Sequence, residues 1–167
     1  MEIISRTTAV VLLIILSPFL LIIGLGNLIL QGRPIIYRQK RVGKDFKEFL
    51  IYKFRTMKNK DAGVDNFSSG QTTTLTKWGR FLRKTKLDEL PQLANIIKGD
   101  MRFIGPRPEV PEYVSQDSFS FLSIIKPGLS GFSSILFRNE SEIWSMIESE
   151  DPYRDILKIK VGLANYY

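Results

Sequence analysis

The sequence predicts a mixed α/β fold that combines one long membrane helix with a small domain of a β-hairpin and amphipathic helices. Residues 7–32 carry no charge, residues 34–58 contain two runs of strand formers around a turn, and residues 75–99 repeat apolar side chains at helical spacing. The chain has 167 residues, which is enough for one domain with a hydrophobic core.

The composition restricts the chemistry that this chain can perform. It contains no cysteine and no histidine, which excludes thiolate or imidazole zinc sites, disulfides and histidine-activated nucleophiles. Residues 33–107 hold 18 basic and 7 acidic side chains, whereas residues 108–167 hold 5 basic and 9 acidic ones. The central segment is therefore expected to face nucleic acid, an anionic membrane surface or a phosphorylated substrate.

Residues 1–33 are predicted to form a membrane helix, because residues 7–32 are long and apolar enough to reach across a hydrocarbon core. This stretch is too long for a signal peptide and lacks a small-residue cleavage site. Ser17 and Pro18 lie near its middle, where proline favours a kink or a break. Basic residues flank both ends, which favours a helix-break-helix hairpin in one leaflet, although a kinked spanning helix fits the same residues.

Residues 34–167 are predicted to form one soluble domain that begins with the β-hairpin. Its strands are expected within residues 35–42 and 46–54, joined by a Gly-Lys-Asp turn. Residues 58–74 are polar and glycine-containing, which predicts a mobile loop. Residues 75–86 predict a basic amphipathic helix, whose charged face either is simply solvated or binds an anion.

A second helix is predicted to begin at about Asp88, with Pro91 in its first turn and Gly99 at its C-terminal cap. Asp88 and Glu89 would then cap the helix and complement its dipole, as acidic residues do in many structural helices. The same position also suits phosphoryl chemistry, because backbone donors at a helix start stabilise a phosphoryl group brought there. The residues alone leave both interpretations open.

Pro106 and Pro108 fix the backbone on either side of Arg107. This arrangement lowers the entropy cost of presenting a guanidinium, which is well suited to bidentate phosphate recognition. A rigid turn with an incidental arginine fits equally well.

Several blocks of the sequence, taken in order, closely resemble the bacterial sugar transferase family, the monotopic phosphoglycosyl transferases. The blocks are Ser17-Pro18, residues 37–43 (YRQKRVG), 52–57 (YKFRTM), 87–93 (LDELPQL), 98–101 (KGDM), 104–109 (IGPRPE) and 126–131 (KPGLSG). The resemblance covers about residues 1–139. The Leu-Asp-Glu-Leu-Pro-Gln block followed by Gly-Pro-Arg-Pro is highly specific.

The resemblance implies an enzyme that transfers a sugar-1-phosphate from a UDP-sugar to polyprenyl phosphate, such as undecaprenyl phosphate, and releases UMP. This would be the first membrane step of glycan or glycoconjugate assembly at the bacterial cytoplasmic membrane. The Ser17-Pro18 break would make residues 1–33 re-entrant in the cytoplasmic leaflet, and residues 34–167 would form a catalytic domain facing the cytoplasm. The sugar, the pathway, the acceptor length and association into a homo-oligomer stay open.

The resemblance also assigns roles to individual residues. Asp88 is expected to attack the β-phosphate and to carry the phosphosugar until polyprenyl phosphate accepts it, which is a ping-pong course. Glu89, together with Asp88, is expected to hold Mg²⁺, a cation that prefers oxygen ligands. The residues expected to bind phosphate or to lie beside it are Lys53, Arg55, Arg83, Pro106, Arg107 and Pro108.

The sequence departs from the family in two places. Where many members have Gln-Val-Asn-Gly-Arg-Asn, residues 133–139 read SSILFRN, which leaves the choice of sugar open. Members also usually continue beyond the position of Tyr167 with a further apolar stretch. We therefore expect either an unusually short member or a protein longer than this chain.

Other functions fit the sequence less well. A membrane-tethered binding protein without catalysis would use Asp88 and Glu89 only as helix caps. Aromatic side chains in the basic hairpin could stack on bases, but the membrane segment and the acid pair argue against a nucleic-acid partner. A glycosidase needs two carboxylates on either side of the scissile bond, which adjacent residues supply poorly.

Overall fold

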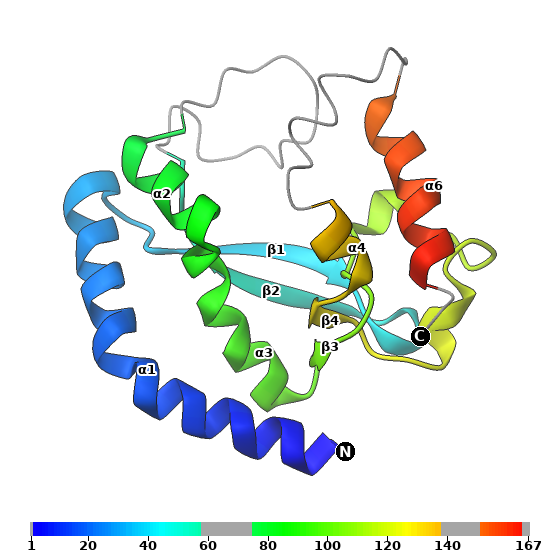
Figure 1. Cartoon of the computed structure of the whole chain (residues 1–167), viewed down its shortest axis with the longest axis horizontal. Helices are drawn as coiled ribbons and strands as arrows, with labels where there is room; N and C mark the ends of the chain where they lie inside the picture. Colours follow the sequence, from blue (N-terminus) through cyan, green and yellow to red (C-terminus); the bar gives the residue numbers. More distant parts are fainter. Residues whose placement is uncertain (1, 58–74, 138–150, 165–167) are drawn as a thin grey trace.

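The computed structural model describes residues 2–57, 75–137 and 151–164. Figure 1 shows a long N-terminal helix along the outer edge of the molecule, a β-hairpin across its middle and shorter helices around the hairpin. The predicted combination of a long apolar helix with a small mixed α/β domain is confirmed. The predicted loop at residues 58–74 lies outside the described residues.

The apolar segment forms one helix, α1 (Glu2–Gln31), with a mean hydropathy of 2.8 in its most apolar window. It is long and apolar enough to cross a membrane, and 11% of that window is buried within the protein. The helix continues through Pro18, and Figure 1 shows it bent near its middle. Pro18 cannot donate to the carbonyl of Ile14, but the hydroxyl of Ser17 donates to that carbonyl at 2.8 Å. The expected helix break is therefore a bend in a continuous helix.

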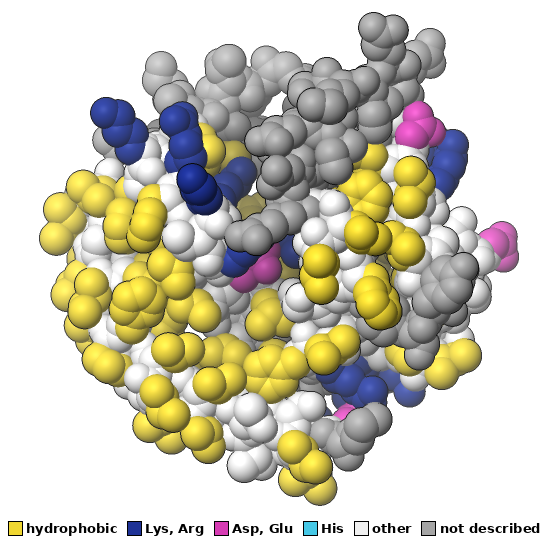
Figure 2. All heavy atoms as spheres, in the orientation of Figure 1, with side chains coloured by type: hydrophobic (Ala, Val, Ile, Leu, Met, Phe, Trp, Pro, Cys, Tyr) yellow, Lys and Arg dark blue, Asp and Glu magenta, His cyan; other side chains and the backbone are white. Residues whose placement is uncertain are grey.

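Both arms of α1 pack against the domain. Before the bend, Ala9 is fully buried in a cluster that includes Ile96, and after the bend Ile23 packs with Phe54 and Leu82. Apolar side chains that stay exposed on α1 are Ile3, Ile4, Val10, Val11, Ile14, Ile15, Phe19, Leu21, Ile22, Leu25, Ile29 and Leu30. Figure 2 shows hydrophobic side chains along this outer edge. One side of α1 thus contacts protein, and the other is suited to lipid.

The predicted hairpin is formed by β1 (Ile36–Val42) and β2 (Glu48–Phe54), which are antiparallel and joined through the 3₁₀ helix η1 (Lys44–Phe46). Alternate residues of a strand share a face. Phe49 and Ile51 of β2 pack in the cluster that contains Leu93 and Ile96, and Lys53 follows them on that face. The hairpin thereby turns the Lys53 ammonium toward the segment that carries the acid pair.

The predicted basic helix is α2 (Lys77–Thr85), and its N-terminus is capped by Thr76, whose hydroxyl accepts from the Gly79 N–H at 2.9 Å. A Cβ on Gly79 would lie 1.8 Å from the carbonyl oxygen of Thr56, so only glycine permits this approach of α2 to the end of β2. The helix ends at Thr85, and Lys86, its C-terminal cap, has a φ of 60°.

The next segment differs from the single helix that the sequence predicts. It consists of a 3₁₀ helix, η2 (Leu87–Gln92), followed by a short α-helix, α3 (Leu93–Lys98). Pro91 lacks the N–H that an α-helical hydrogen bond requires, and regular α-helical structure begins only after it. The acid pair therefore lies in η2 and not at the start of an α-helix, while Gly99 caps α3 as expected, with a φ of 89°.

Two short parallel strands, β3 (Arg102–Ile104) and β4 (Gly128–Ser130), hold the Gly-Pro-Arg-Pro turn against the domain. A Cβ on Gly128 would lie 2.1 Å from the backbone nitrogen of Gly105, so this packing also requires glycine. The remaining elements are η3 (Pro111–Tyr113), η4 (Ser120–Ser123), α4 (Phe132–Leu136) and α6 (Pro152–Ala164). A second core joins η4, α6 and the end of β1.

Candidate active site

Glu89 of η2 is held by cations from two distant parts of the chain. Its Oε1 accepts hydrogen bonds from Nζ of Lys53 at 3.0 Å and from Nη2 of Arg107 at 2.9 Å. Burial alone would raise the pKa of Glu89, but Arg107 and Lys53 together outweigh burial and lower that pKa to about 2. Glu89 is therefore ionised throughout the physiological pH range.

Asp88 is buried beside this cluster in a different electrostatic state. Its Oδ1 accepts no hydrogen bond from any described residue. Burial raises the pKa of Asp88, and the charge of Glu89 adds to this effect while Lys53 and Arg83 oppose it. An unpartnered buried polar atom costs about 1–3 kcal/mol. This oxygen is thus the place where a ligand atom would complete the site.

These contacts argue against a purely structural cap. Within the described ranges, neither Asp88 nor Glu89 accepts a hydrogen bond from a backbone N–H, which is what a capping carboxylate does. Glu89 instead binds two cationic side chains, and Asp88 is left buried beside them.

Lys53 is a largely enclosed ammonium, with 17% of its side chain exposed, and it has a shifted pKa. Burial and the neighbouring charge of Arg107 lower its pKa to about 8, although Glu89 opposes this shift. Lys53 is therefore mostly protonated at neutral pH and becomes neutral in mildly alkaline solution.

Arg107 is presented by a turn that is fixed on both sides. The carbonyl of Pro106 accepts from the backbone N–H of Gly128 at 2.9 Å, and the carbonyl of Pro108 accepts from Nη1 of Arg41 at 3.1 Å. Both prolines are buried, whereas the Arg107 side chain is 28% exposed. This geometry agrees with a turn that presents a guanidinium.

A second buried ion pair follows directly after this turn. Nη1 of Arg41 lies 3.3 Å from Oε2 of Glu109, and the two side chains are 8% and 5% exposed. The hydroxyl of Tyr153 on α6 also donates to Glu109. This pair has no signal in the sequence, because its two residues are 68 positions apart and no local pattern links them.

Arg83 and Arg55 occupy different environments. Nε of Arg83 donates to the hydroxyl of Thr56 at 2.9 Å, and its charge acts on Asp88. Arg55 points toward α1, where it donates to the carbonyls of residues 31, 32 and 33. The structure thus brings Lys53, Arg83 and Arg107 together around the acid pair but directs the Arg55 guanidinium to the end of α1.

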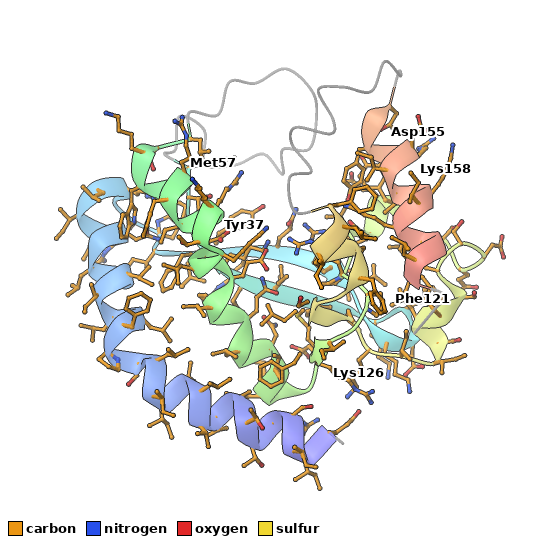
Figure 3. All side chains as sticks on the ribbon, in the orientation of Figure 1. Tyr37, Met57, Phe121, Lys126, Asp155 and Lys158 are labelled. Carbon is orange, nitrogen blue, oxygen red and sulfur yellow. The ribbon has the colours of Figure 1, made fainter. Side chains whose placement is uncertain are left out.

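The site is reached from the protein surface. Figure 2 shows an acidic group flanked by basic side chains near the centre of the visible face. In Figure 3, the side chain of Tyr37, a residue of β1, is labelled beside α2. Ser17 and Pro18 lie in α1 and contribute no side chain to the acid pair.

The acid pair fits a hard divalent cation. Asp88 has a buried oxygen without a hydrogen-bond partner among the described residues, and Glu89 adds an adjacent ionised carboxylate. Within the described ranges no group of three or more acidic side chains forms at this site or at any other, so the two carboxylates would share the cation with ligands from outside the chain. Mg²⁺ is commonly held by one or two carboxylates together with substrate phosphates, and Asp88 and Glu89 could supply the two carboxylates of such a set.

The comparison with protein families agrees with this geometry. The model of the family described as bacterial sugar transferase matches residues 1–163. The chain belongs to the bacterial sugar transferase family. The resemblance stated from the sequence motifs is therefore confirmed over nearly the whole chain.

Three relatives illustrate the range of this family. A UDP-N-acetylgalactosamine-undecaprenyl-phosphate N-acetylgalactosaminephosphotransferase of Aeromonas hydrophila is 35% identical over 134 residues, which are 77% of this chain and 32% of that protein. A UDP-glucose:undecaprenyl-phosphate glucose-1-phosphate transferase of Escherichia coli (strain K12) is 34% identical over 147 residues, 84% of this chain and 32% of that protein. An undecaprenyl-phosphate galactose phosphotransferase of Salmonella typhimurium is 35% identical over 150 residues, 79% of this chain and 31% of that protein.

The chain thus spans about a third of the length of these relatives. This sugar transferase chain contains the acid pair, the cations around it and the apolar helix α1.

Proposed function

We propose that this sugar transferase moves a sugar-1-phosphate from a UDP-sugar to undecaprenyl or another polyprenyl phosphate, with release of UMP. The observation that carries the proposal is the asymmetry of the acid pair: Glu89 binds two cations, and Asp88 keeps a buried oxygen without a partner among the described residues. A carboxylate held next to cations, but bonded to none of them through this oxygen, is suited to attack an anionic phosphorus centre.

The reaction is proposed to run in two steps. In the first, a carboxylate oxygen of Asp88 attacks the β-phosphorus of the donor, the bond from that phosphorus to the bridging oxygen breaks, and UMP leaves. In the second, an oxygen of polyprenyl phosphate attacks the same phosphorus, the bond to Asp88 breaks, and the lipid diphosphate sugar leaves. Atoms and charge balance in both steps, and Asp88 returns to its ionised form.

The surrounding residues have distinct proposed roles. Lys53 and Arg107 orient the diphosphate and offset its charge, and Glu89 holds both cations in place. Arg83 supplies a further positive charge near Asp88. Mg²⁺ bound by the oxygens of Asp88 and Glu89 would neutralise the diphosphate charge. Phosphate binding by Arg55 is less well supported, because its guanidinium is engaged by the end of α1.

The contacts of α1 support re-entrant insertion in the cytoplasmic leaflet of a bacterial membrane. Glu2 at one end lies within 2.9 Å of Lys126, and Gln31 at the other end donates to the carbonyl of Arg55 at 2.8 Å. Both ends therefore contact the same domain. A helix that crossed the bilayer would carry one of its ends to the opposite side.

The topology can be tested because the chain contains no cysteine. Thr7→Cys and Arg33→Cys, each made alone, should both be labelled in inside-out vesicles and protected in intact cells from a reagent that does not cross membranes. Labelling of only one of the two positions from each side would contradict re-entrant insertion.

The covalent step can be tested without the lipid acceptor. The protein is incubated in nanodiscs with Mg²⁺ and a panel of UDP-sugars, and intact mass and UMP release are measured. We expect a phosphosugar adduct that maps to Asp88, with one UMP released for each protein. An adduct on another residue, or its persistence in Asp88→Asn, would overturn the assignment.

The donor panel is needed because the named relatives use different sugars. The names of the three relatives specify N-acetylgalactosamine, glucose and galactose. If UDP-sugars bind without either adduct or UMP under acceptor-free conditions, and no product forms when acceptor is added, a binding protein without catalysis is the better description.

A further inference from the structure

A hollow beside the N-terminal end of α1 gathers three cations around one carboxylate. The Glu2 carboxylate lies 2.9 Å from Nζ of Lys126, 3.4 Å from Nη2 of Arg102 and 4.0 Å from Nη2 of Arg6. Residues that line this hollow include Ser5, Arg6, Gly99, Met101, Arg102 and Lys126. With three cations against one carboxylate, the hollow keeps a positive charge.

The backbone at the end of α3 helps to position one of these cations. A Cβ on Gly99 would lie 2.1 Å from Nη2 of Arg6, so the guanidinium lies directly against this glycine. Gly99 is the C-terminal cap of α3, where backbone carbonyl groups favour a nearby positive charge. A larger side chain at position 99 would displace Arg6 from the hollow.

Exposed isoleucines accompany the charged residues. The exposed fractions are 81% for Ile3, 70% for Ile4, 72% for Ile104 and 75% for Ile124. The first two directly follow Glu2, and the others stand two residues from Arg102 and from Lys126. Figure 2 shows a charged group near the N-terminus with hydrophobic side chains beside it, and Figure 3 shows Lys126 at this end of the molecule. An apolar border fits a phosphate that is attached to hydrocarbon better than a soluble anion.

We propose that this hollow binds the headgroup phosphate of an anionic phospholipid, with Arg6, Arg102 and Lys126 as its ligands. The Glu2 carboxylate occupies the position that the phosphate takes when lipid is bound. The proposal rests on the insertion of α1 proposed above but not on the sugar transfer. The residues that line this hollow do not include Asp88, Glu89 or the cations around them, so the proposed lipid is distinct from the reacting acceptor.

The site makes predictions of opposite sign for its acidic and basic members. The full chain is reconstituted in nanodiscs of phosphatidylcholine with phosphatidylglycerol, and native mass spectrometry counts the lipids retained after release. Arg102→Gln and Lys126→Gln should each lower retained phosphatidylglycerol about fivefold. Glu2→Gln should raise it severalfold, because a competing carboxylate is removed. Retained phosphatidylcholine should not change in any of the three.

A matched control comes from a lysine that also pairs with a carboxylate but lies far from α1. Nζ of Lys158 on α6 is 3.0 Å from Oδ1 of Asp155, and Figure 3 shows both near the opposite end of the molecule from Lys126. Lys158→Gln should leave lipid retention unchanged. Lys126→Arg keeps the positive charge and should retain phosphatidylglycerol. This variant keeps the test valid if Lys126→Gln unfolds.

Several outcomes would overturn the proposal. If Glu2→Gln lowers phosphatidylglycerol retention as the basic variants do, Glu2 only fastens the helix to the domain. If Lys158→Gln lowers it equally, the effect is one of general charge. If inorganic phosphate displaces phosphatidylglycerol, or polyprenyl phosphate is retained in its place, the ligand is a soluble phosphate or the acceptor. Failure of α1 to insert would be seen separately, because no nanodisc complex would form.

Discussion

Two buried centres lie on either side of the turn that carries Arg107. Each pairs a glutamate with cationic side chains, but the two have different roles. In the first centre, Arg107 and Lys53 both bind Glu89. In the second, Arg41 binds Glu109. The Arg41 and Glu109 side chains are almost fully enclosed, and Tyr153 also donates to Glu109. The acid centre is more open at its cations and leaves an oxygen of a neighbouring carboxylate without a partner among the described residues. The closed pair holds the turn, whereas the open centre has the partly exposed cations and the unpartnered oxygen that the proposed reaction needs.

The largest expected effect comes from removing the charge of Asp88. Asp88→Asn should lower UMP release by about a thousandfold or more, because a nucleophile is lost. It should not lower the free energy of unfolding, since burial already raises the pKa of this carboxyl and disfavours its charged form. Acceptor-free turnover and thermal unfolding in nanodiscs measure the two quantities. A large loss of stability would mean that the buried charge of Asp88 stabilises the fold, as we expect for the charge of Glu109.

The opposite result is expected for the closed pair. Glu109→Gln leaves the Arg41 charge buried without its carboxylate and should cost about 3 kcal/mol in the free energy of unfolding. Activity per folded molecule should fall much less than in Asp88→Asn, because the side chain of Glu109 bonds Arg41 and Tyr153 and not the acid pair within the described residues. Denaturant unfolding followed by tryptophan fluorescence gives the stability. Unchanged stability together with lost activity would assign Glu109 to the site instead.

The pH dependence of donor binding tests whether the charge of Lys53 in the open centre contributes to binding. The pKa of Lys53 is lowered to about 8, so its positive charge is present below this pH and is lost as pH rises through it. Binding of a UDP-sugar to Asp88→Asn, which removes turnover, should therefore weaken about tenfold above pH 8. In the double variant with Lys53→Arg this step should disappear, since arginine stays charged. If binding still weakens above pH 8 in the double variant, a group other than Lys53 titrates.

Local patterns were sufficient to predict most elements. Two runs of strand formers around a turn predicted the hairpin, and apolar residues at helical spacing predicted α2. The acid pair and the Arg107 turn were found through motifs that resemble the family. Each of these signals lies within a few consecutive residues.

The features that the sequence did not predict depend on partners far apart in the chain. Lys53 and Arg107 lie 36 and 18 residues from Glu89 in the sequence. No local pattern therefore indicates that they bind Glu89 and not Asp88. The direction of Arg55 depends on where α1 ends. The continuity of α1 is a local exception: Pro18 favours a break, but the hydroxyl of the preceding Ser17 bonds the carbonyl that Pro18 leaves without a donor.

The smallest effect is expected for an ion pair at the surface of the hairpin, which calibrates the buried ones. Nζ of Lys40 on β1 lies 3.1 Å from Oε2 of Glu48 on β2, but the two side chains are 70% and 49% exposed. Water and salt screen such a pair, so Lys40→Gln should change the free energy of unfolding by less than about 1 kcal/mol. Denaturant unfolding beside Glu109→Gln measures the ratio of the two effects. Comparable losses of stability would show that burial does not determine how much an ion pair stabilises this protein. The closed and open centres would then differ only in the unpartnered oxygen of Asp88.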